Sequence, residues 1–200
     1  MYANIARYAG AAGKIGDAAE KVRQGLLPLF REQKGFLGYA AFASEQGDGV
    51  SIHLWESAEA WADCREKIRA WVQPNIPDFL DPTERVQGEV QRHAIAEPQS
   101  GGQGQSLYCL IRKAENLGAE MRGAARDEML DASRKAAGFR GVYYMRSTNN
   151  PSLGASVLFC DTREHAAAVH ETTAAIARER QPDVNVRVAA SGQTTVLAMA

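Results

Sequence analysis

The chain carries two copies of one pattern, and this internal duplication constrains its fold more than any other feature of the sequence. Gly35 to Trp61 reads GFLGYAAFASEQGDGVSIHLWESAEAW, and Gly138 to Ala166 reads GFRGVYYMRSTNNPSLGASVLFCDTREHA. In each copy a Gly-Phe pair opens one strand, a turn of Gly, Asn, Asp or Pro reverses the chain, and a second strand follows. Ser57 and Thr162 then provide hydroxyl groups that can cap the start of a helix.

The elements around the two copies also recur in one order. Strand-forming residues precede the first helix of each half, and a further strand follows the second helix. The predicted elements outside the two copies are strand 2–9, a helix from Ile15, a second helix with Trp61, Cys64, Ile68 and Trp71 on one side, strand 85–95, strand 106–113, helix 119–135, helix 165–180 and strand 184–199. Pro28 falls inside the first helix and is expected to kink it. Each half is therefore predicted to be a βαββαβ unit, the ferredoxin-like arrangement.

Residues 97–106, EPQSGGQGQS, contain no large apolar side chain and are predicted to be a flexible linker. This gives repeat 1 at residues 1–96 and a degenerate repeat 2 at residues 107–200. A sheet with both helices on one face leaves its other face in need of cover. A linker of about ten residues can span roughly 30 Å, enough for the second sheet to fold back. The predicted fold class is α+β, with two fused ferredoxin-like repeats forming an intramolecular, pseudo-dimeric α/β barrel.

The composition excludes several classes of partner. A net charge of −1 without a cluster of Lys or Arg argues against nucleic-acid binding. No apolar stretch approaches the ~20 residues that a membrane crossing needs, and the first residues do not resemble a signal peptide. The three cysteines lack metal-binding or disulfide spacing. We expect a cytoplasmic protein that binds a small molecule, with no metal, nucleic-acid or membrane partner. Homo-oligomer formation through sheet edges or helices stays open.

The first half resembles the antibiotic biosynthesis monooxygenase (ABM) superfamily of dimeric α/β-barrel proteins. The resemblance rests on Gly35-Phe36-Leu37-Gly38-Tyr39, on His53-Leu54-Trp55-Glu56-Ser57 and on Glu59-Ala60-Trp61. The second half keeps the Gly-Phe-x-Gly motif but has Cys160 where the first half has Trp55. The resemblance implies the barrel fold. In quinone-forming members of the superfamily, which oxidise polycyclic phenols with O2 and no cofactor, the counterpart of Trp55 lines the substrate cavity. The resemblance therefore also implies a substrate cavity beside Trp55.

Strand alternation places Ser51, His53 and Trp55 on one face of their strand, opposite an aliphatic row. Such a face suits the wall of an apolar cavity in which a phenolic proton is removed. We predict His53 and Trp55 as catalytic residues, with His53 as the candidate base. The predicted substrate-binding residues are Ser51, Trp61, Tyr39, Arg7 and Asn4. The structural alternative is that Trp55 and Trp61 are core residues and that His53 is a core or rim residue.

Two further features bear on the site. Arg7 and Arg112 are predicted to share one strand position, where an inward arginine could bind an anionic group and an outward one could form an ion pair. The haem-degrading branch of the superfamily has an asparagine in the first strand, which Asn4 matches, and a helical histidine, which no residue between Cys64 and Asp78 matches. No cofactor is therefore expected. Two functions stay open: a cofactor-independent monooxygenase, and a non-catalytic module for ligand binding or assembly.

Overall fold

The computed structural model describes residues 1–96, 106–118 and 123–199, and its elements follow the predicted order. The strands are β1 (Tyr2–Tyr8), β2 (Phe36–Ala43), β3 (Gly49–Trp55), β4 (Glu84–Ile95), β5 (Tyr108–Glu115), β6 (Phe139–Ser147), β7 (Gly154–Cys160) and β8 (Asn185–Met199). The helices are α1 (Ile15–Lys21), α2 (Leu27–Arg31), α3 (Ala58–Asn75), α4 (Gly123–Lys135) and α5 (Arg163–Arg180). The predicted linker lies outside the described residues, except for Ser106.

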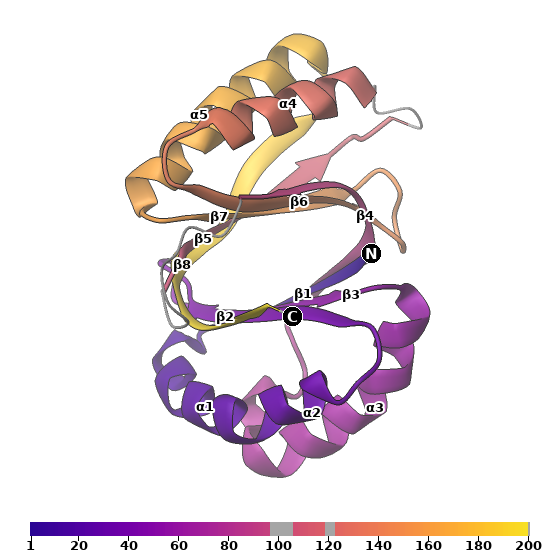
Figure 1. The fold of residues 1–200 in the computed structure, drawn as a ribbon, viewed down its shortest axis with the longest axis vertical. Coiled ribbons are helices and arrows are strands. Elements are labelled where there is room, and N and C mark those ends of the chain that lie inside the picture. Colours follow the sequence, from indigo (N-terminus) through magenta and orange to yellow (C-terminus); the bar gives the residue numbers. More distant parts are fainter. Residues whose placement is uncertain (97–105, 119–122, 200) are drawn as a thin grey trace. The chain divides into compact units, whose positions relative to one another are not determined.

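The chain forms two compact units, one of Met1–Glu89 with Gln193–Ala200 and one of Val90–Gly192. The sheet of the first unit has the order β4-β1-β3-β2-β8, and that of the second unit has β8-β5-β7-β6-β4. In each unit the helices cover one face of the sheet, with α1 to α3 in the first unit and α4 and α5 in the second (Figure 1). The strand order closes on itself as in a barrel. The predicted class, two ferredoxin-like repeats forming one intramolecular α/β barrel, is confirmed.

Strands β4 and β8 pass from one unit into the other, so the compact units differ from the two repeats of the sequence. The first part of β4 pairs with β1, from Glu84 opposite Arg7 to Glu89 opposite Tyr2. The last part of β8 pairs with β2 of the other repeat. Each repeat therefore supplies one strand end to the sheet of the other.

The repeated sequence motifs have a local structural reason. The Ser57 hydroxyl accepts a hydrogen bond from the Ala60 N–H at 3.2 Å, and Thr162 caps α5 in the same way. Gly138 has φ of 66°, and a Cβ there would lie 2.0 Å from His165 Nδ1. Only glycine adopts this conformation and also leaves room for the neighbouring side chain. The Gly-Phe pairs and the hydroxyl caps thus fix how each strand pair joins its second helix.

The first helix contains a π-helical turn shortly before Pro28. The turn covers Val22–Leu26, and the Leu27 N–H donates to the Val22 carbonyl, one residue further back than in an α-helix. Proline offers no N–H and crowds the turn before it, and a wider turn relieves that crowding. Val22 and Leu26 are both buried on the inner side of this turn.

The strand register corrects one prediction from the sequence. Ser51 lies opposite Ala6, and its counterpart in the second repeat, Ser156, lies opposite Arg112. Arg112 therefore occupies the position of Ala6 rather than that of Arg7. Because neighbouring residues of a strand point to opposite faces, the two arginines lie on opposite faces of their sheets.

Candidate functional site

A cavity of about 490 Å³ lies in the first unit between the sheet and its helices. Its volume falls within the range typical of small-molecule sites. Strands β1, β2, β3, β4 and β8 line one side, and α1, the π-turn, α3 and the short helical turn Pro77–Phe79 line the other. The cavity is thus built entirely from residues of one compact unit.

Two rows of side chains that run across the strands form the sheet wall. One row contains Gln87, Asn4, His53 and Tyr39. The next row contains Arg85, Ala6, Ser51, Ala41 and Val196. Period-two alternation brings these residues to one face, and the register of five strands brings them side by side. Of the seven predicted site residues, Asn4, Tyr39, Ser51, His53 and Trp61 line the cavity.

The helix wall is mainly apolar. Its apolar side chains are Ile15, Ala18, Ala19, Val22 and Leu26 from the first helix, and Trp61, Ile68 and Val72 from α3. The Trp61 ring centroid lies 5.3 Å from that of His53, and Phe30 contacts His53 edge-on at 5.4 Å. An aromatic or polycyclic ligand would therefore meet apolar side chains on one side and polar groups on the other.

Three residues of the sheet wall carry buried polar atoms without a partner among the described residues. These atoms are Asn4 Nδ2, Ser51 Oγ and His53 Nδ1. All three residues are less than 8% exposed. Buried polar groups are nearly always hydrogen-bonded, and each orphan needs an explanation. Three orphans on adjacent positions of one cavity wall are best explained by groups that a ligand satisfies.

His53 is neutral in this cavity. Burial, together with the positive charge of Arg85, lowers its pKa to about 3. Burial also raises the pKa of the Tyr39 phenol well above its usual value, so both groups stay uncharged near pH 7. Tyr39 meets His53 through its ring, at a centroid distance of 5.0 Å and an angle of 76°. A neutral imidazole and two neutral phenols, including Tyr8, give the wall hydrogen-bonding capacity without fixed charge.

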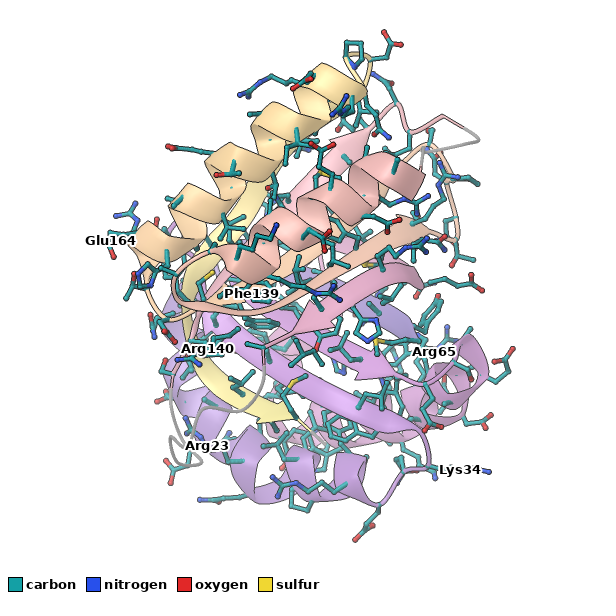
Figure 2. All side chains as sticks on the ribbon, turned by 45° about the horizontal axis from the view of Figure 1, so that its top comes forward. Arg23, Lys34, Arg65, Phe139, Arg140 and Glu164 are labelled. Carbon is teal, nitrogen blue, oxygen red and sulfur yellow. The ribbon has the colours of Figure 1, made fainter. Side chains whose placement is uncertain are left out.

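Positive charge gathers where the cavity opens to solvent. The charged residues of the lining are Arg65, Glu66, Arg69 and Arg85, and all four are exposed; Arg65 extends from α3 (Figure 2). Arg69 forms an ion pair with Asp81, with 3.4 Å between Nη1 and Oδ1. Arg85 instead donates a hydrogen bond from Nη1 to Asn4 Oδ1 at 3.3 Å. Arg85 forms no ion pair within the described part of the chain. Arg85 was not among the predicted site residues, because its position depends on the pairing of β4 with β1.

Two predicted site residues lie away from the cavity lining. Trp55 is fully buried, and its ring packs against Phe36 at 5.6 Å and Trp61 at 6.1 Å. Arg7 lies on the other face of β1, where its Nε donates to Asp48 Oδ2 at 2.6 Å. Trp55 can thus act on the cavity only through its neighbours, and the charge of Arg7 is already paired.

The corresponding space of the second unit is filled by larger side chains. The counterparts of Ala6, Ala41 and His53 in the strand register are Arg112, Tyr144 and Leu158. A cavity of only about 50 Å³ is left there. The duplicated fold has therefore kept a ligand-sized cavity in the first unit and filled its counterpart in the second.

Within residues 1–96, 106–118 and 123–199, no cluster of three or more His, Cys, Asp or Glu side chains is placed to hold a metal ion. None of the helices there combines the length and the apolar character that crossing a membrane requires.

A known family model matches the first part of the chain. Residues 1–70 match the family model described as antibiotic biosynthesis monooxygenase, as the sequence motifs predicted. No curated protein sequence matches the chain.

Solved structures share the fold over nearly the whole chain. A proposed monooxygenase from Fusobacterium nucleatum is 10% identical with a TM-score of 0.73, over 99% of this chain and 94% of that one. An anthrone oxidase-like protein is 15% identical with a TM-score of 0.60, over 100% and 93%. Chlorite dismutase from Candidatus Nitrospira defluvii is 13% identical with a TM-score of 0.60, over 98% and 91%. At these identities the likeness concerns the fold alone.

Proposed function

We propose that the protein is a cofactor-independent monooxygenase acting on a small aromatic or polyketide-like molecule, because its residues 1–70 match the antibiotic biosynthesis monooxygenase family model. The observation that carries this proposal is the cavity of the first unit, with three orphan polar atoms on its sheet wall and an apolar, tryptophan-containing helix wall. A flat, hydroxylated ring system would match both walls.

The reaction would use molecular oxygen as the only oxidant. An electron-rich phenol with an oxidisable C–H position would lose its hydroxyl proton, and the resulting anion would react with O2 at that carbon. One oxygen atom would stay on the carbon as the new quinone carbonyl, and the other would leave as water with the two hydrogens lost by the ring. The four electrons given up by the substrate reduce O2 completely, so no further reductant is needed.

The side chains of the cavity would favour the anion and hold it in place. Arg85 would stabilise the negative charge electrostatically, and Asn4 and Ser51 would hydrogen-bond the oxygen substituents. His53 would accept the hydroxyl hydrogen bond through its unpaired nitrogen and then take the proton. The adjacent anion would raise the low pKa of His53 once it forms. Trp61 and Tyr39 would pack against the rings, and Trp55 would be a positioning residue behind Trp61.

Oxygen consumption with hydroxylated polycyclic aromatics, including anthrones, would test the proposal. We expect saturable uptake by the wild type with formation of the quinone, and uptake reduced about 100-fold or more in His53→Ala, a size typical of losing a general base. Arg85→Gln should weaken turnover most for substrates that react as anions. Arg7→Gln is the matched control, because Arg7 lies on the other face of the sheet. Equal turnover in His53→Ala and wild type would reject His53 as the base.

A non-catalytic ligand-binding function is the second candidate, and the pKa of His53 favours it. A histidine whose pKa is about 3 accepts a proton poorly. Under this function the same aromatic molecules would bind and quench the tryptophan fluorescence, and Arg85→Gln would weaken their binding. No oxygen would be consumed and no quinone would form. The two functions therefore differ in oxygen uptake at ligand concentrations that saturate the fluorescence signal.

A further inference from the structure

The second unit buries an arginine without a carboxylate partner. Arg112 of β5 is only 3% exposed. Its Nε donates to Ser156 Oγ at 2.8 Å, Nη1 donates to Thr173 Oγ1 at 2.5 Å, and Nη2 donates to the Tyr144 hydroxyl at 3.4 Å. The guanidinium carbon also lies 5.7 Å from the centre of the Tyr144 ring. All these partners are neutral, so the described residues hold the buried charge by dipoles alone.

A buried charge without a counterion is unusual, because desolvation disfavours it unless an opposite charge or a full set of hydrogen bonds compensates. A guanidinium has five N–H donors, and the three bonds above use one on each nitrogen. One N–H on each terminal nitrogen is left over. The described residues around the arginine supply no carboxylate for these two donors.

A small pocket opens beside this guanidinium. Its volume is about 50 Å³, and Arg112, Tyr144, Ser156 and Thr173 all contribute to its lining. No Asp or Glu belongs to the lining. A polar pocket needs only about 10–15 Å³ to hold one water molecule, so this one admits an anion of a few heavy atoms.

The polar side chains of Gln91, Lys113 and Gln181 also contribute to the lining. The rest of the lining is apolar and includes Leu117, Met129, Ala174, Ala177, Val184 and Val186. A halide or an inorganic oxyanion has no apolar part that could pack against these apolar side chains. A carboxylate with a short alkyl tail would satisfy both the donors and the walls.

We propose that this pocket is a binding site for a small aliphatic monocarboxylate, of the size of acetate or propionate. The two free guanidinium N–H groups would donate to the carboxylate oxygens. The Ser156 and Tyr144 hydroxyls accept hydrogen bonds from Arg112, so their protons remain available for the same anion. The alkyl tail would contact the apolar side chains. The site lies wholly in the second unit and is independent of the reaction proposed for the first.

Titration of the 200-residue protein with sodium acetate and sodium propionate tests the proposal, with sodium chloride at equal concentration as the reference. Binding would be followed by saturation-transfer NMR of the methyl groups and by the rise in the thermal unfolding midpoint. We expect saturable binding of both acids, with propionate bound about fourfold more tightly for its additional buried CH2 group. Formate should bind more weakly than acetate.

Three variants locate the site. Arg112→Met keeps the length of the side chain, removes its charge and should abolish binding. Ser156→Ala removes one donor and should weaken binding about tenfold. Arg7→Met removes an arginine from the first unit and should leave binding unchanged.

The proposal is overturned if the wild type binds neither acid, if Arg112→Met binds them as the wild type does, or if chloride binds as tightly as acetate. Should Arg112→Met fail to fold, Ser156→Ala decides the matter. Unchanged affinity in that variant would place the acid elsewhere and overturn the assignment.

Discussion

Replacing His53 by leucine should remove a pH-dependent loss of stability. The counterpart of His53 in the second repeat is Leu158, which is fully buried there. The fold thus already accepts leucine at this position. His53→Leu also removes the orphan Nδ1, so the variant should be at least as stable as the wild type at pH 7.

The size of the effect follows from the pKa of His53. Burial lowers this pKa to about 3 in the folded protein, whereas an unfolded chain has the ordinary value of about 6.5. Below pH 6.5 the unfolded chain binds a proton that the folded protein excludes, so stability is complete above this pH and falls as the pH decreases toward 3. Linkage gives a loss of about 2 kcal/mol between pH 7 and pH 5 for this group.

Urea unfolding of both proteins at intervals from pH 7 to pH 5 measures this term. The other three histidines, His93, His165 and His170, are present in both proteins, so their titration cancels in the difference. We expect the stability of His53→Leu relative to the wild type to grow by about 2 kcal/mol over this range. Parallel pH dependence of the two proteins would refute the conclusion that the fold holds His53 neutral.

Substitutions at Ser57, Gly138 and Asp48, the first two with a comparison variant, test local features by urea unfolding. Ser57→Ala removes the cap of α3 and should cost about 1 kcal/mol, whereas Ser57→Asp should restore most of it. Gly138→Ala would place a methyl group 2.0 Å from the His165 ring and should lower the free energy of unfolding by more than about 1 kcal/mol. Gly16→Ala has open space around it and should be neutral or stabilising. Equal effects of the two substitutions would contradict the steric reason. Asp48→Ala removes the acceptor for Arg7 and the Gly10 N–H and should cost about 2 kcal/mol. No loss in that variant would show that water replaces both bonds.

Local features of the sequence predicted the fold well. The Gly-Phe pairs, the hydroxyl caps and the alternating strand residues are each set by neighbours in the sequence, and each appears in the structure where it was expected. The π-turn before Pro28 was missed, because the sequence shows that proline disturbs a helix but does not show how the helix responds. The predicted repeat boundaries differ from the compact units because strand exchange depends on pairing between distant segments.

The site was predicted only in part, because some of its residues are brought together by contacts between segments that are distant in the sequence. Alternation along one strand placed Ser51 and His53 on a common face, and both line the cavity. It placed Trp55 on the same face but could not show that Phe36 and its neighbours cover that end. Arg85 and Arg112 depend on which strands pair and in which register. Tertiary packing determines both the strand pairing and the register, and no short sequence pattern around either arginine indicates them.

The exchange of strand ends has a consequence for any shortened version of the chain. A fragment ending at residue 96 would contain β2 but not the segment of β8 that runs beside it, from Thr194 to Met199. The N–H and C=O groups along that side of β2 would then be exposed as an open edge, and open edges recruit strands from other molecules. Half of this gene would therefore yield a self-associating product, because each half completes its hydrogen bonding only with a length of chain encoded in the other.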